Sequence, residues 1–401
     1  MARVTRWLER PVFMALAGAV SLALVSIAAS QLLLFGAVVG AIWRCRRRQV
    51  SLRPWPPISW PLLAFAGWTI VAILSSRDVA QGLLETRKFF LYLILLLLPL
   101  TAQDESDSVR IYRCVFLVSV VATSAGLAQF MSHPFDLQYR VSGLMSHWMT
   151  YSGLLMLVLV ALSAYAVCRP GRPEWWVFPL GLLLASGIYV SQTRSVWLGA
   201  IAGATTVFLL MRPRALFPMA ALLVALYLAS PASIHERVRS TWDARDPETR
   251  ARTDLVRTSV RLIRDNPWLG VGPKNVKQEA VRYRGRNEFA DWLYQHMHND
   301  FLQIAAERGI PGLLLWLWFM IRLGWDALEV ERSARKGIAG RADPDTCAPL
   351  MVATSALGGW VAFLVAGMFE YNFGDSEVLT LFLFIMASPY VSLRHRAVAK
   401  Y

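Results

Sequence analysis

The stretch from Trp148 to Cys168, WMTYSGLLMLVLVALSAYAVC, contains no charged side chain and is long enough to cross a lipid bilayer as a helix. Apolar runs of this kind recur from one end of the 401-residue chain to the other. Hydrophobic residues make up 56% of the sequence and charged residues only 17%, which is too apolar for a soluble domain. The sequence therefore predicts an all-α fold, a polytopic bundle of membrane helices.

Hydropathy and turn signals predict about twelve spans. They lie at residues 12–27, 29–43, 59–75, 83–100, 111–131, 148–168, 175–191, 195–211, 215–230, 311–326, 350–369 and 377–392. The patch Ser26–Gln31 favours a turn between the first two, although residues 12–43 also fit one long run. The chain thus divides into spans 1–9 (1–230), one long loop with short helices (231–310), and spans 10–12 with a tail (311–401).

The distribution of Lys and Arg predicts the orientation in the membrane. If the N-terminus is cytoplasmic, all six inner connections are basic, whereas each short outer connection carries at most one Lys or Arg. This pattern follows the positive-inside rule, so we expect both termini in the cytoplasm and the long loop outside. The same bias accounts for much of the net charge of +14, and nucleic acid is the poorer explanation of that charge.

The predicted outer face contains ionisable residues, which are costly at membrane depth and are therefore functional candidates. Arg194 lies at a turn between two spans, and Arg87 and Lys88 lie just inside the outer end of the fourth span. Arg140 and Glu370 lie in or beside outer loops. The alternative for the long basic side chains is that they only extend their charges to the interface.

The long loop contains a predicted arginine-rich helix at residues 248–265, which Pro267 ends. One face of it is apolar and the opposite face is basic; the apolar residues are Leu255, Val256, Val260, Leu262 and Ile263, and the basic ones are Arg250, Arg257, Arg261 and Arg264. An arginine stripe can bind phosphate, but it is also typical of a solvated face. Arg252 instead lies near the apolar face, where a guanidinium needs an anionic partner.

The glycine-rich segment that follows, Trp268–Lys274 (WLGVGPK), resembles part of a phosphate-binding loop. It lacks the eight-residue P-loop pattern, and it faces a compartment without ATP in the predicted topology. We therefore expect no nucleotide site. Lys274, Arg261, Arg264 and Glu370 remain possible substrate contacts.

The loop ends in QHMHNDFL, residues 295–302. A short helix is predicted from about Asp300 to Arg308, capped by Asn299 or Asp300, before Gly309 and Pro311 break the chain.

His298 is thereby placed at a helix start near the bilayer surface. A histidine titrates near pH 6.5 in general, which suits a base that works at neutral pH. His296 and His298 could instead be two metal ligands, but no third ligand follows at a helical spacing. An interfacial histidine without a chemical role is the remaining alternative.

Several motifs in a fixed order resemble the O-antigen ligase and polymerase superfamily. They are Thr193-Arg194-Ser195-x-Trp197-Leu198-Gly199, Arg252 with Pro267 fifteen residues on, Leu269-Gly270-Val271-Gly272-Pro273, His298-Asn299-Asp300-x-Leu302, and Glu307-x-Gly309-Ile310-Pro311-Gly312. The length, and the lack of a soluble C-terminal extension, look most like the ligase branch.

The resemblance implies a GT-C-like membrane fold and an inverting glycosyltransferase that needs no metal or other cofactor. Its partners would be O-antigen linked to undecaprenyl pyrophosphate, the lipid A-core and membrane lipid, with no nucleic acid or nucleotide. The reaction would take place at the periplasmic face of the bacterial inner membrane. By motif, His298 is the catalytic residue and Arg194 and Arg252 bind the donor pyrophosphate; Arg87 and Lys88 are weaker candidates for that binding.

Other assignments stay open. An O-antigen polymerase or a protein O-oligosaccharyltransferase would differ in the acceptor, which the sequence does not state. A flippase or transporter would place ionisable residues in the middle of spans and show paired interrupted helices, whereas most charges here lie at span ends. A double displacement would need a carboxylate nucleophile, for which Glu370 is nearest, but we prefer a substrate-binding role for it.

Overall fold

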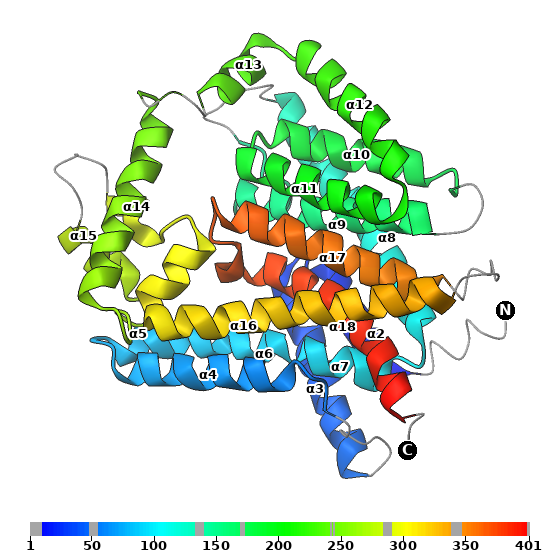
Figure 1. Ribbon diagram of the computed structural model, residues 1–401, viewed down its shortest axis with the longest axis horizontal. Coiled ribbons are helices and arrows are strands. Elements are labelled where there is room, and N and C mark those ends of the chain that lie inside the picture. Colours follow the sequence, from blue (N-terminus) through cyan, green and yellow to red (C-terminus); the bar gives the residue numbers. More distant parts are fainter. Residues whose placement is uncertain are drawn as a thin grey trace.

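The computed structural model describes residues 10–47, 55–132, 140–168, 173–240, 243, 245–283, 291–337 and 347–398. Helices joined by turns make up this part of the chain, and no described residue lies in a β-strand. Helices α4 (Ser59–Leu74), α16 (Asp300–Gly337), α17 (Ala348–Gly367) and α11 (Arg194–Met211) pack in succession, while α14 (Pro247–Asp265) and α15 (Val276–Tyr283) cover one end (Figure 1).

The predicted polytopic helical class is confirmed. Among the described residues, seven helices are long and apolar enough to cross a membrane. They are α3 (Ile27–Arg46), α8 (Glu105–Ser132), α9 (Trp148–Cys168), α11, α16, α17 and α18 (Ser376–Val398). An eighth is possible by these criteria if α12 (Leu216–Leu228), preceded by the turn η2 (Pro213–Ala215), counts with α13 (Ala232–Arg239), although the two segments are bent by 112°.

The remaining predicted spans are helical but short or interrupted. Helices α2 (Pro11–Leu22), α4 and α10 (Val177–Val190) are apolar but have only 12, 16 and 14 residues. The fourth predicted span, 83–100, is divided into η1 (Leu84–Lys88), α6 (Phe89–Tyr92) and α7 (Ile94–Thr101), and the short helix α5 (Val79–Leu83) comes just before it. The first two predicted spans are separate helices, and the Ser26 hydroxyl caps the second.

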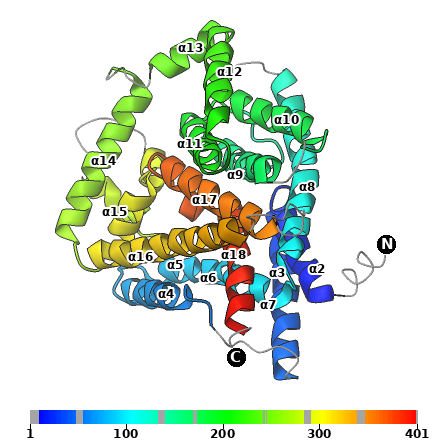
Figure 2. The same ribbon diagram turned by 45° about the vertical axis from the view of Figure 1, so that its right-hand side comes forward.

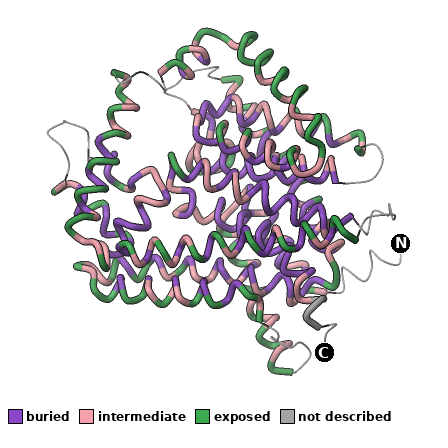
Figure 3. Tube along the Cα trace, in the orientation of Figure 1, coloured by how far each residue is buried: buried purple, intermediate pink, exposed green. Residues whose placement is uncertain are grey.

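The outer surface of the bundle is apolar, as a membrane protein requires. Leu117, Leu182 and Phe217 are each more than 70% exposed, far beyond what the surface of a soluble protein tolerates in such numbers. Buried residues concentrate in the central helices, whereas α12 contains no buried residue (Figure 3).

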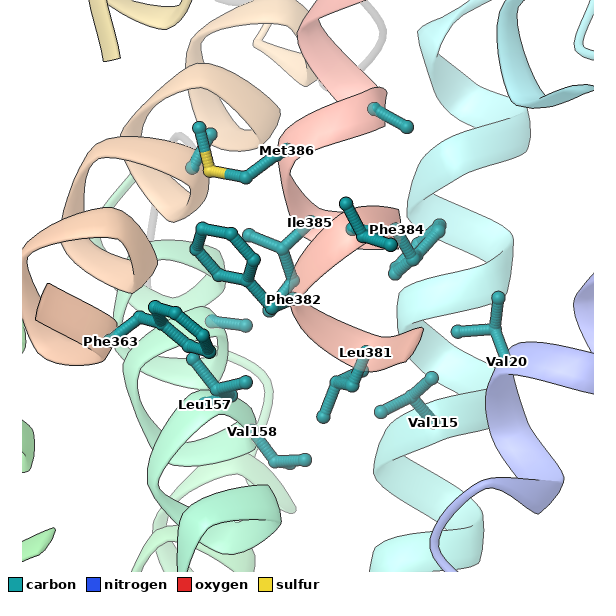
Figure 4. Packing of buried hydrophobic residues seen from close by; sticks show 14 of the residues in the cluster. Val20, Val115, Leu157, Val158, Phe363, Leu381, Phe382, Phe384, Ile385 and Met386 are labelled. Atoms are coloured by element: carbon teal, nitrogen blue, oxygen red, sulfur yellow. The ribbon is translucent and has the colours of Figure 1, made fainter. Parts of the chain in front are cut away.

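The core is built where α18 packs between α9, α17 and α8 (Figure 4). Phe363 and Phe382 stack with ring centroids 4.0 Å apart. Helices α11 and α17 approach closely through small residues: a Cβ added at Gly203 would lie 2.8 Å from the Gly358 carbonyl oxygen. Close backbone contact of this kind is how helices associate where lipid supplies no hydrophobic drive.

The start of α2 and the last turns of α18 lie on the side of the bundle away from α14 (Figures 1 and 2). Arg10, just before α2, pairs with Asp107 at the start of α8 at 2.6 Å. Arg394 of α18 donates to the Pro99 carbonyl in α7 at 2.5 Å. This arrangement fits an even number of membrane crossings. The compartment on each side of the membrane stays a prediction. The predicted inner connections at 169–172 and 338–346 and the end of the tail, 399–401, lie outside the described residues.

In the predicted outer loop, α14 packs against α15, and α15 packs against η3 (Asp291–Gln295). Residues 241, 242, 244 and 284–290 of this loop lie outside the described part. Helices α14 and α15 and the turn η3 share a hydrophobic cluster with the start of α16, which includes Leu255, Leu262 and Tyr294. One prediction for α14 was wrong: Val256 and Val260 are 46% and 54% exposed. The packed face is partly polar instead, because Asp254 accepts a buried hydrogen bond from Tyr294 and so belongs to the interior.

Candidate functional site

Four arginines, three from helices α11, α13 and α14 and one from the stretch before α9, converge on Glu248 in the first turn of α14. The Glu248 Oε2 atom lies 3.0 Å from Arg194, 2.6 Å from Arg237 and 3.8 Å from Arg140. The Oε1 atom lies 3.4 Å from Arg252, one turn further along α14. Pro247 and the Asp246 cap start the helix at this point, where an acidic side chain is favoured by the helix dipole.

The arginines keep the Glu248 carboxyl ionised. Burial raises its pKa, but the charges of Arg237, Arg194 and Arg252 together outweigh burial and lower the pKa to about 2. Arg194 is the first residue of α11 and also donates to the Ser240 hydroxyl at 3.0 Å. The cluster thus joins α11, α13 and α14.

Arg252 connects this cluster to the histidine. Its Nη2 atom lies 3.2 Å from Glu370 Oε1, and Glu370 Oε2 lies 3.0 Å from His298 Nδ1. The anionic partner expected for Arg252 is therefore present twice, as Glu248 and Glu370. Three sequence motifs that are far apart in the chain meet here at one end of the bundle.

The conformation of His298 is fixed by hydrogen bonds at the residues on both sides of it. Its own φ is +46°, a left-handed conformation that few residues other than glycine adopt. The predicted cap is confirmed: the Asn299 side chain accepts from Leu302 N at 2.9 Å and donates to the Met368 carbonyl at 2.7 Å. On the other side, Met297 N donates to Gln303 Oε1 at 2.8 Å.

His296 packs against His298, with ring centroids 4.1 Å apart. Burial, followed by the charges of His298 and His147, lowers the pKa of His296 to about 3. His296 is therefore neutral at physiological pH and places no positive charge beside His298. His147 stacks on Trp148 at 3.9 Å, and burial lowers its pKa also.

A second charged cluster lies behind the histidines, around Glu85. Lys88 pairs with Glu85 at 2.6 Å, and Lys274 and Arg308 approach the same carboxylate at 3.8 Å. Lys88 also lies over the ring of Tyr371, the neighbour of Glu370, at 5.4 Å. Tyr371 is thus the side chain between the two clusters.

The glycine-rich segment Trp268–Lys274 has a structural role, because its backbone is hydrogen-bonded to that of α16. Val271 N donates to the Ala306 carbonyl at 2.9 Å, Gly272 N to the Glu307 carbonyl at 3.0 Å, and Ile310 N to the Pro267 carbonyl at 2.7 Å. These bonds cover the predicted break in α16, where Gly309 has φ +69°. The motif that resembles a phosphate loop therefore binds the backbone of a broken helix.

The structure separates the remaining candidates. Arg87 is exposed and donates to the Leu84 carbonyl, and Arg261 and Arg264 are exposed on the outer face of α14, away from the cluster. Lys88 and Lys274 belong to the cluster around Glu85. The contacts with substrate that the sequence predicts for these five residues stay predictions.

Two members of the site were not predicted, Arg237 and Glu248. Arg237 carries no local signal, since its partner follows eleven residues later across a turn. Glu248 was seen only as the start of a helix, although an acid in a first turn among so many arginines was a usable signal. Among the residues that the structure describes, no three His, Cys, Asp or Glu side chains form a group that could hold a metal ion.

Residues 179–317 match the family model described as O-antigen ligase. The matched segment contains Arg194, Glu248, Arg252 and His298, and it confirms the resemblance to this superfamily. It supports a membrane glycosyltransferase activity of the ligase and polymerase type, with lipid-linked polysaccharide as substrate. No curated protein matches the chain.

Proposed function

Because residues 179–317 match the O-antigen ligase family, we propose that this protein transfers O-antigen from undecaprenyl pyrophosphate to the lipid A-core. The transfer would take place at the periplasmic face of the inner membrane, with both termini in the cytoplasm. The observation that supports it best is the chain of contacts from the arginine cluster through Glu370 to His298.

The arginine cluster suits a pyrophosphate that is esterified at both ends. Four guanidinium groups against the carboxylates of Glu248 and Glu370 leave a net charge of +2. Such a pyrophosphate carries two ionised oxygens, and guanidinium forks match their geometry. Fixed positive charges also stabilise the charge that develops as the pyrophosphate leaves, so no metal ion is needed for that purpose in this proposal.

His298 would act as the base. A hydroxyl oxygen of the acceptor forms a bond to the anomeric carbon of the donor while the bond from that carbon to the phosphate oxygen breaks. The hydroxyl proton passes to His298 Nε2, and the bonding electron pair remains on the pyrophosphate. One displacement of this kind inverts the anomeric configuration.

A reconstituted reaction tests this function. Purified protein, lipid-linked O-antigen and lipid A-core are combined with and without a chelator, and the linkage formed is analysed by NMR. We expect chelator-resistant transfer with inversion. His298→Ala and Arg194→Ala should fold normally but lose at least about 100-fold in kcat, the usual contribution of a base or a charge-stabilising donor.

Arg239→Ala is the matched control, because Arg239 is exposed on α13, two residues from Arg237. It should keep wild-type activity. Wild-type turnover by His298→Ala would refute the role of the base. Transfer only to a second lipid-linked glycan would indicate a polymerase, and movement of the lipid across liposomes without a new glycosidic bond would indicate a transporter.

A further inference from the structure

Glu370 lies behind the two residues to which the proposed function gives chemical roles. Its side chain is 3% exposed, whereas His298 is 20% and Arg252 30% exposed. The buried carboxylate therefore contacts both residues from the protein side, while both keep a face toward solvent.

We propose that Glu370 is a positioning residue, which fixes the orientation of His298 and ties it to Arg252. This inference rests on the proposed function and gives Glu370 a role different from the substrate contact predicted from the sequence. Each Glu370 oxygen already accepts from a protein group, Oε2 from His298 and Oε1 from Arg252. That arrangement suits neither direct contact with a sugar nor attack on an anomeric carbon.

The contact determines which histidine nitrogen can act. An ionised carboxylate only accepts hydrogen bonds, so His298 Nδ1 must carry its proton toward Glu370. The lone pair is then on Nε2, the atom that receives the acceptor proton. When the imidazolium forms, its new charge lies 3.0 Å from the carboxylate and is stabilised there.

The second oxygen of Glu370, Oε1, fixes the distance between His298 and Arg252. Because the same carboxylate holds Arg252, the base and one arginine of the leaving-group site keep a constant separation. Holding reacting groups in a fixed arrangement is a large part of enzymatic rate enhancement.

Substitution by glutamine is a sharp test of this role. The amide of Glu370→Gln has one donor end, which must face either the His298 Nδ1 proton or the Arg252 guanidinium. We expect kcat of the reconstituted transfer to fall about 10- to 100-fold, with the KM for the lipid-linked donor changed less than about threefold. Glu370→Asp keeps the charge and should recover part of kcat.

A double variant separates positioning from an independent effect. If Glu370 acts through the base, Glu370→Gln adds no further loss to His298→Ala. Glu377→Gln, a nearby acid in the first turn of α18, is the control and should keep wild-type kcat. Wild-type kcat in Glu370→Gln, multiplicative losses in the double variant, or a raised KM with unchanged kcat would each overturn the proposal.

A spectroscopic readout makes the result independent of turnover. In protein labelled with ¹⁵N-histidine, the His298 signals are assigned by their loss in His298→Ala. They should report an Nδ1-protonated ring in the wild type and a changed tautomer population in Glu370→Gln. An unchanged ring would refute the positioning role, whereas absence of transfer by the wild type would count against the proposed function instead.

Discussion

Three residues other than glycine have positive φ in the described part of the chain: Gln192, Lys274 and His298. Gln192 comes two residues before Arg194, Lys274 approaches Glu85, and His298 contacts Glu370. A left-handed conformation costs such residues about 1–2 kcal/mol. Strain that is concentrated in this way is common where side chains must be held for function.

Gly309 gives a testable case at the same scale. A Cβ at this position would lie 2.1 Å from the Trp268 carbonyl oxygen, and the backbone is left-handed. We expect Gly309→Ala to lower stability by at least about 2 kcal/mol, seen as a lower thermal midpoint in detergent.

Gly67→Ala is its control, because nothing lies within 4 Å of an added Cβ there. That variant should stay within about 1 kcal/mol of the wild type. Equal midpoints for the two variants would show that the break in α16 tolerates a side chain.

At the scale of elements, α14 is held to the bundle through Glu248. The pKa of this carboxyl is lowered to about 2, so its ion pairs are intact above the ordinary glutamate pKa and are lost as pH falls toward 2. We expect amide exchange at the start of α14, corrected for intrinsic rates, to speed up roughly tenfold from pH 6 to pH 3, a value discounted for partial exposure.

The Glu248→Gln variant should lose most of this pH dependence. Glu236→Gln, an exposed acid on α13, should keep it. If both variants respond to acid like the wild type, the ion pairs of Glu248 do not hold α14.

The helix itself could be predicted from the sequence, and its surroundings could not. Periodicity found α14 and placed Arg252 on its packed side. It misassigned Val256 and Val260, because a polar contact such as Asp254 with Tyr294 looks like a solvated position in a hydropathy pattern.

At the scale of the whole molecule, the apolar runs located the seven long apolar helices of the described residues, since hydropathy is a local property. The motifs named His298, Arg194 and Arg252. The connection between them runs through Glu370, which follows His298 by 72 residues and Arg252 by 118. Such partners depend on how distant helices pack, which no local pattern records.

The topology can be measured directly. In a variant without the four natural cysteines, Lys277→Cys, at an exposed position of α15, should react with a membrane-impermeant maleimide in intact spheroplasts. A variant that keeps only Cys45, at the end of α3, should react only after permeabilisation. Labelling in the reverse order would place the arginine cluster in the cytoplasm.

Helices α2, α10 and α4 have 12, 14 and 16 residues, and at 1.5 Å per residue they reach about 18–24 Å. The hydrocarbon of a typical bilayer is about 30 Å thick. Helix α2 is mostly buried by its neighbours, but where α4 or α10 crosses the bilayer, the acyl chains beside it would shorten by disordering and draw the headgroups inward. A substrate anchored by its own lipid tail would move toward the bilayer centre together with the headgroups. A membrane of short, fluid acyl chains therefore suits this protein better than a thick, ordered one.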